Sequence, residues 1–236
     1  MIPRPVRARP GLPPAWAALD PAQRRGITLD RVRAALAART LDRARDRVPP
    51  GGTGRRGDPC RPGDGLGSAV LVALFEEGEE ARVVLTRRSA ELLTHRGEVA
   101  FPGGRLDPGE GPVEAALREA TEEVGLPASL VEVVGQLSAL HTVSSRSGIV
   151  PVVGFLAARP ALRPNPAEVD RVFDASLAEL ASGGIYREER WGVAEGPERP
   201  IHFFELDGET VWGATARVLR ELLDVVLGYP SRHELT

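Results

Sequence analysis

The stretch GGRLDPGEGPVEAALREATEEVGL, from Gly103 to Leu126, places a glycine pair and a proline-rich turn ahead of a helical segment. Pro112 suits the first turn of a helix, where its missing N–H costs nothing, and Gly125 suits a left-handed end. These signals predict a helix from Pro112 to about Val124. At helical spacing, one side of this helix is apolar and should face the core; it carries Val113, Leu117, Ala120 and Val124.

The other side of the predicted helix carries Glu119, Glu122 and Glu123. Like charges at helical spacing destabilise a helix by a few tenths of a kcal/mol per pair, so a compensating charge is expected. Hard divalent cations such as Mg²⁺ bind through carboxylates, backbone carbonyls, water and substrate phosphates. A solvated surface is the alternative, but the glycine pair and Glu110 ahead of the helix favour a metal that also holds a diphosphate.

This segment resembles the Nudix box, G-x5-E-x7-R-E-U-x-E-E-x-G-U, in which U is a bulky aliphatic residue. Ala120 at the first U position is a mild departure. The resemblance implies an α/β fold, the Nudix-type α/β/α sandwich with a mixed β-sheet. It also implies hydrolysis of nucleoside diphosphates linked to a further moiety, with Mg²⁺ or Mn²⁺ as the cofactor. The matching residues are Gly104, Glu110, Arg118, Glu119, Glu122, Glu123, Gly125 and Leu126.

Carried over by position, the resemblance implies that Glu119 and Glu123 are the main metal ligands, together with the carbonyl of Gly103 or Gly104. Glu122 would be a further ligand or the catalytic base that orients water. Bound cations would then turn a repulsive cluster of carboxylates into a favourable one.

Two further implications concern the surroundings of this centre. Glu110 and Arg118 would form a supporting ion pair. Glu168 precedes a predicted strand, where some Nudix enzymes place an extra metal-binding or catalytic carboxylate. A surface or ion-pair role for Glu168 is the alternative, and the identity of the general base stays open.

The segment VLTRRSAELLTHRGEVAFPGG, residues 84–104, resembles the signature that precedes the box in coenzyme A-cleaving Nudix proteins, roughly L-L-T-x-R-S-x3-R-x3-G-x3-F-P-G-G. Leu93 stands where the pattern has arginine, and Arg96 lies close enough to serve instead. The resemblance implies that Arg88, Ser89 and Arg96 bind substrate, because arginines bind phosphates well. If Arg88 pairs with the 3′-phosphate of coenzyme A, its loss should penalise coenzyme A more than dephospho-coenzyme A.

We therefore expect hydrolysis of the diphosphate of coenzyme A or its derivatives to 3′,5′-ADP and (acyl-)4′-phosphopantetheine. One alternative is a Nudix pyrophosphatase that acts on ADP-ribose, dinucleotides or another nucleoside diphosphate derivative. A second is a non-catalytic Nudix-like ligand sensor. The expected partner is a small-molecule nucleotide substrate, without membrane or nucleic acid, and a homodimer is left open.

The chain has 236 residues, 42% of them hydrophobic, which is enough for one large domain. We expect an N-terminal extension at 1–67, loosely ordered except for an amphipathic helix at 29–47, with a flexible Pro/Gly-rich linker at 49–67. The Nudix domain should span 68–230. It should begin with a hairpin over SAVLVALF and ARVVLTR and contain helices near 176–181 and 214–227; the other expected strands are EVAF, VEVVGQL, IVPVVGFLA, RVFDA, IYREER and IHFFELDG.

The remaining composition restricts the location and chemistry of the protein. The first thirty residues lack an apolar core of the signal-peptide type, and no run of about 18 apolar residues occurs. We expect a cytoplasmic protein. The one cysteine, Cys60, excludes an intrachain disulfide.

Overall fold

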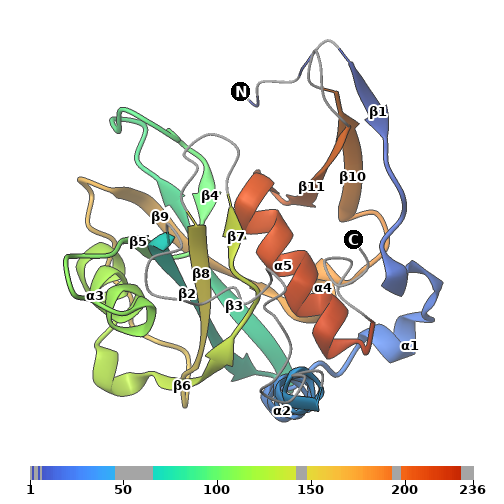
Figure 1. Ribbon diagram of the computed structural model, residues 1–236, viewed down its shortest axis with the longest axis horizontal. Coiled ribbons are helices and arrows are strands. Elements are labelled where there is room, and N and C mark those ends of the chain that lie inside the picture. The colour runs from blue at the N-terminus through green and yellow to red at the C-terminus, as the bar shows by residue number, and fades with distance from the viewer. Residues whose placement is uncertain are drawn as a thin grey trace, which may run out of the picture.

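The computed structural model describes residues 7–45, 66–141, 148–192 and 198–229, together with residues 2 and 5. Its two β-sheets and its helices are arranged as shown in Figure 1. Within these residues the larger sheet contains eight strands: β2 (Leu66–Glu77), β3 (Glu80–Arg88), β4 (Val99–Ala100), β5 (Gly103–Arg105), β6 (Glu132–Gln136), β7 (Leu140–His141), β8 (Gly148–Phe155) and β9 (Val169–Ser176).

The larger sheet is mixed, as the fold class predicted. Its main order is β4-β3-β2-β8-β6, and β5, β7 and β9 pair with β2, β8 and β3 respectively. The β2–β8 pair is parallel and the others are antiparallel. The predicted hairpin is β2–β3, whose turn residues Gly78 and Glu79 both have positive φ, as a two-residue type I′ turn requires.

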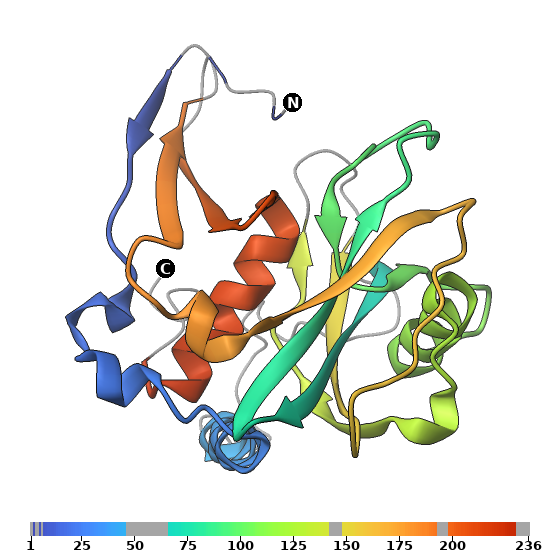
Figure 2. The same cartoon turned by 180° about the vertical axis from the view of Figure 1, so that it is seen from behind.

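A smaller antiparallel sheet was not predicted as a separate layer. Its order is β1-β10-β11-β12, and its strands are β1 (Ala8–Pro10), β10 (Tyr186–Trp191), β11 (Arg199–Leu206) and β12 (Glu209–Trp212). The segments IYREER and IHFFELDG thus form strands, but in this second sheet. Figure 2 shows it beside the larger sheet, with α5 between them.

Four helices agree closely with the predicted spans: α2 (Leu29–Arg45), α3 (Pro112–Val124), α4 (Leu177–Leu180) and α5 (Gly213–Val226). The short helix α1 (Pro21–Arg24) and the 3₁₀ turns η1 (Ala15–Ala18) and η2 (Ala128–Leu130) were not predicted. Gly125 ends α3 in the left-handed conformation, as expected. In the described part of the chain, no helix is both long and apolar enough to cross a membrane.

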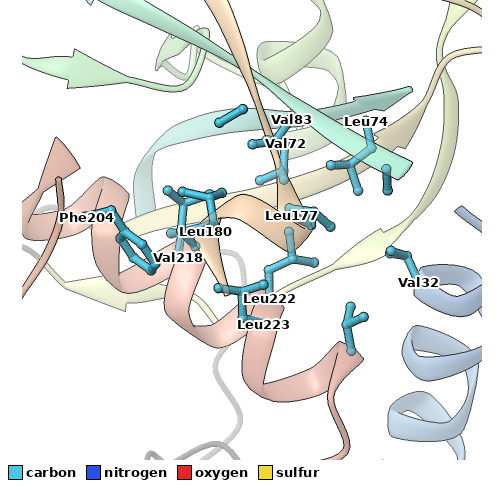
Figure 3. Packing of buried hydrophobic residues seen from close by; sticks show 14 of the residues in the cluster. Val32, Val72, Leu74, Val83, Leu177, Leu180, Phe204, Val218, Leu222 and Leu223 are labelled. Atoms are coloured by element: carbon cyan, nitrogen blue, oxygen red, sulfur yellow. The ribbon is translucent and has the colours of Figure 1, made fainter. Parts of the chain in front are cut away.

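Both faces of the larger sheet are buried, and alternating residues of β2 show why. Leu71, Ala73 and Phe75 pack with α3 in one core cluster, whereas Val72 and Leu74 pack with α5 in the other. The second cluster also receives Leu177 and Leu180 of α4 and Phe204 of the smaller sheet (Figure 3). Among the described residues, α3 is therefore the helix that packs on this face of the sheet, and the candidate site is built beside it.

The N-terminal segment corrects the expectation of a loosely ordered extension. Trp16, Ile27, Val32 and Leu36 are buried in the α5-side core. The N–H of Ala81 donates to the Ile27 carbonyl at 2.6 Å, and β1 adds a strand to β10. Residues 7–45 are therefore integral to the fold. Residues 49–65 of the predicted linker lie outside the part of the chain that the structure describes.

A substitution at Trp16 tests this correction. Trp16 is 1% exposed and meets Tyr186 edge-on, with ring centroids 5.4 Å apart. Trp16→Ala should lower the free energy of unfolding by about 3–5 kcal/mol, as expected for truncating a buried aromatic side chain. Both losses are measured by urea unfolding. The control Leu12→Ala should lower the free energy of unfolding by less than about 1 kcal/mol, because Leu12 is 51% exposed. Equal small losses would mean that this segment does not pack as described.

Candidate active site

The glycine pair is required by the close approach of β5 to its neighbours. Gly103 pairs with Val70 of β2, and a Cβ at Gly103 would lie 2.4 Å from the Ala69 carbonyl oxygen. A Cβ at Gly104 would lie 2.3 Å from Oε1 of Glu119. These positions have no room for a side chain, so the backbone can run directly beside the α3 carboxylates.

Glu123 is the most buried of the three helix carboxylates, at 2% exposed. The N–H of Gly103 donates to its Oε2 at 3.0 Å, and Nη1 of Arg88 lies 3.5 Å from its Oε1. Burial raises the pKa of Glu123 to about 7, although the backbone hydrogen bond and Arg88 act in the opposite direction. Without a further cation, this carboxylate is costly to keep ionised.

The other two carboxylates are less buried than Glu123. Glu119 is half-buried, and burial raises its pKa against the opposing effect of Arg118. Glu122 is exposed, with 57% of its side chain accessible. The predicted carboxylate face is therefore graded from buried to open.

Arg118 joins the box carboxylates to one another. It donates to both oxygens of Glu110, at 2.9 and 3.0 Å, and this pairing lowers the pKa of Glu110. Its Nη1 also lies 3.1 Å from Glu119 and 3.1 Å from Glu122. Arg118 thereby partly offsets the repulsion on α3, with Glu110 holding the guanidinium in place.

Glu168 is brought to the same region by a loop that caps the end of α3. The N–H of Asn165 donates to the Glu123 carbonyl at 2.8 Å, and the N–H of Glu168 donates to the Asn165 carbonyl at 3.0 Å. The charge of Glu168 contributes to the raised pKa values of Glu119 and Glu123. Asn165 was not singled out from the sequence, although its Asn-Pro pair is a recognisable turn signal.

The predicted substrate residues separate in space. Arg88 reaches Glu123, whereas Arg96 is exposed and donates to the Leu92 carbonyl of its own loop. Ser89 is buried, and its Oγ accepts from the N–H of Glu91 at 3.3 Å. Leu93 is 90% exposed. Among these residues, Arg88 is the one with a contact to the α3 carboxylates.

The fit to a divalent cation depends on the carboxylates and on the backbone beside them. Among the described residues, no group of three or more His, Cys, Asp or Glu side chains is arranged to hold a metal ion. The donors present nevertheless suit a hard cation, because Glu119 and Glu123 lie beside the backbone of the glycine pair. The buried Glu123, with its raised pKa, is a carboxylate that an added cation would stabilise.

Comparison with known proteins gives a family match over this region. The model of the NUDIX domain matches residues 65–191. The chain is 39% identical over 160 residues to an uncharacterized Nudix hydrolase NudL of Photorhabdus laumondii, covering 67% of this chain and 84% of that protein. It is 40% identical over 173 residues to the chloroplastic Nudix hydrolase 22 of Arabidopsis thaliana, covering 69% of this chain and 56% of that protein.

Solved structures with a similar arrangement include a MutT/nudix family protein from Enterococcus faecalis. Its TM-score is 0.47 at 16% identity, covering 85% of this chain and 74% of that one. The Nudix hydrolase RenU from M. smegmatis has a TM-score of 0.42 at 27% identity, covering 48% of this chain and 71% of that one.

The raised pKa of Glu123 predicts a pH-dependent stability. Between its ordinary value of 4.5 and about 7, the folded protein binds more protons than the unfolded chain, so stability falls as pH rises through this range. In metal-free protein at pH 8, Glu123→Gln should therefore be more stable than the wild type. We expect a gain of about 1–3 kcal/mol, because one pKa unit corresponds to about 1.4 kcal/mol.

Urea unfolding in a chelator at pH 5 and pH 8 measures this effect. The gain should shrink at pH 5, and the exposed control Glu122→Gln should show little change at either pH. A Glu123→Gln protein that is less stable than the wild type at pH 8 would contradict the burial of an ionisable carboxylate at this position.

Proposed function

The chain belongs to the Nudix family, and from this premise we propose that it hydrolyses the diphosphate of coenzyme A or its derivatives with Mg²⁺ or Mn²⁺. The products would be 3′,5′-ADP and (acyl-)4′-phosphopantetheine. One observation carries the proposal: Arg88, from the segment that resembles the coenzyme A signature, lies 3.5 Å from Glu123 of the Nudix box. The two sequence patterns thus meet at one carboxylate.

In this proposal, Glu119 and Glu123 hold the cation together with the carbonyl of Gly103 or Gly104, and Glu122 is a further ligand. A divalent cation at this position supplies charge neutralisation for the diphosphate and makes the attacking water more acidic. The chain's own contribution is to fix the carboxylates. The Gly103 N–H orients Glu123, and Arg118 orients Glu119.

Arg88 and Glu168 take the remaining roles in the proposal. The Arg88 guanidinium, already beside Glu123, would donate to an oxygen of the diphosphate. Glu168 is close enough to Glu119 and Glu123 to influence both pKa values, so it is a candidate to accept the proton of the attacking water. Glu122 is the other candidate, although Arg118 holds it on the open side of the helix.

Leu93 favours a second candidate function. This residue stands where the coenzyme A signature has arginine. It is 90% exposed and apolar, so it supplies no positive charge for a phosphate. The same carboxylates could then act on ADP-ribose, a dinucleotide or another nucleoside diphosphate derivative. Only the residues outside the box would differ between these substrates.

Product analysis separates the two candidates. The protein is incubated with Mg²⁺ or Mn²⁺ and either coenzyme A, dephospho-coenzyme A, ADP-ribose or diadenosine polyphosphates, and the products are resolved by chromatography and mass. We expect 3′,5′-ADP and 4′-phosphopantetheine from coenzyme A. Efficient cleavage of another diphosphate without cleavage of coenzyme A would replace the first candidate with the second, and no turnover of any would favour a ligand sensor.

The roles of the carboxylates predict the effect of neutralising them. Glu119→Gln and Glu123→Gln should each lower kcat at least ~10²-fold at saturating metal, because the cation would lose a charged ligand. The matched control is Glu114→Gln on the same helix, whose amide oxygen can still accept from the Gly111 N–H. Circular dichroism should show all three variants folded. Near-normal rates for both test variants would remove these glutamates from the metal site.

The contact between Arg88 and Glu123 changes the prediction of which substrate phosphate Arg88 binds. A residue beside Glu123 should act on the diphosphate, which coenzyme A and dephospho-coenzyme A share, rather than on the 3′-phosphate. Arg88→Ala should therefore lower kcat/KM about 10- to 100-fold on both substrates, as expected from a charge-assisted hydrogen bond of roughly 1.5–3 kcal/mol. Arg96→Ala should leave both nearly unchanged. A loss confined to coenzyme A would restore the 3′-phosphate role of Arg88.

A further inference from the structure

Two arginines share a single carboxylate oxygen on the face of the larger sheet that is opposite to α3. Arg87 of β3 and Arg171 of β9 are cross-strand neighbours. Each donates through Nη1 to Oε1 of Glu209 in β12, at 3.2 and 3.3 Å. The Glu209 side chain is 7% exposed, whereas the two arginine side chains are 38% and 52% exposed. A buried carboxylate thus holds two arginines whose ends reach solvent.

The charges of this cluster do not balance. In the part of the chain that the structure describes, Glu209 is the carboxylate that pairs with Arg87 and Arg171, so two positive charges meet one negative charge. At the other end of β9 the charges do balance, because Arg82 and Arg159 face Asp174 and Glu77. The Arg87–Arg171 pair therefore carries an excess positive charge that an anion would neutralise.

The pair is also held in a defined position. Arg171 lies over the Phe173 ring, 5.3 Å from its centroid, and Glu209 follows directly after the turn residue Gly208. The bonds to Glu209 use one terminal nitrogen of each arginine. Because a guanidinium has five N–H donors, each arginine retains donors for an incoming phosphate.

Two short segments of the chain connect the pair to residues of the proposed catalytic centre. Arg87 directly precedes Arg88, the last residue of β3, and Arg171 follows Glu168 by three residues. Successive residues of a strand point to opposite faces, so Arg87 and Arg88 offer positive charge on either side of the same strand end. β3 ends beside β4, the strand that leads into the glycine pair, and β9 begins at this same end of β3 (Figure 1).

The two arginines proposed from the sequence to bind substrate are engaged locally. Arg88 faces Glu123, and Arg96 donates to the Leu92 carbonyl of its own loop. A substrate with a second anionic group outside its diphosphate would need another partner. Building on the proposed function, we propose that Arg87 and Arg171 form a second anion subsite, which binds a phosphate monoester of the substrate. On coenzyme A this group is the 3′-phosphate.

Nucleotide binding tests the subsite without any need for turnover. The probes are adenosine 3′,5′-bisphosphate and adenosine 5′-monophosphate, titrated calorimetrically into the full-length protein. The wild type should bind the bisphosphate at least about tenfold more tightly, since charge-assisted pairs to phosphate are the strong class of hydrogen bond. The double variant Arg87→Gln/Arg171→Gln should lose this preference and bind both probes alike.

Two further variants make the result decisive. The triple variant Arg87→Gln/Arg171→Gln/Glu209→Gln removes the carboxylate that the double variant leaves buried and unpaired, and it should lose the preference as well. Arg159→Gln is the matched control, because Arg159 is 48% exposed and packs on an aromatic ring but belongs to the balanced cluster. It should keep the wild-type preference.

Equal affinity of the wild type for the two probes, binding of neither, or a preference retained by the double and triple variants would each overturn the subsite. Turnover gives a second measurement. The ratio of kcat/KM for coenzyme A to kcat/KM for dephospho-coenzyme A should be about tenfold or more lower in the double variant than in the wild type, with kcat little changed. A wild type that does not cleave coenzyme A would refute the proposed function, while the binding preference would still decide the subsite.

Discussion

The buried carboxylate of Glu123 ties helix α3 to the backbone that precedes it. Its hydrogen bond to the Gly103 N–H holds the helix against β5, and this close approach leaves no space for side chains at Gly103 or Gly104. Burying a carboxylate is costly, and the cost appears here as a pKa raised to about 7. This loss of stability falls on a carboxylate that the proposed function assigns to a divalent cation, which would recover it when bound.

The surrounding charges are arranged around this constraint. Arg118, itself held by Glu110, offsets the charge of Glu119 and Glu122. Arg88 offsets part of the charge of Glu123 from the opposite side. On the other face of β3, Arg87 and Arg171 share the single carboxylate of Glu209, which leaves a surplus of positive charge among the described residues. If both proposals hold, the end of β3 separates the region that binds cations from the region that binds an anion.

Local signals in the sequence were sufficient for α3 and for the β2–β3 hairpin. Pro112 and Gly125 mark both ends of the helix, and the glycine in EEGEE marks the turn. The same pattern could not rank the three glutamates by burial. Glu123 is buried because β5 passes directly over it, and that depends on the pairing of Gly103 with Val70.

Long-range pairing accounts for the rest of what the sequence did not predict. Ala8 pairs with Trp191, a contact that no local periodicity encodes, and the Arg- and Pro-rich surroundings of Trp16 favoured disorder over burial. The Arg87–Glu209 and Arg171–Glu209 bonds likewise join strands distant in the chain. In contrast, Glu168 was predicted near the site by resemblance alone, and the Asn165 turn is the physical reason that it lies there.

The most direct test of this account is to locate a bound cation. Crystals soaked in Mn²⁺ and measured at its absorption edge should show an anomalous peak within about 2.0–2.3 Å of carboxylate oxygens of both Glu119 and Glu123, with a backbone carbonyl of the glycine pair beside it. The account would be contradicted by a peak bound elsewhere, or by none at saturating Mn²⁺ in crystals in which both carboxylates are ordered.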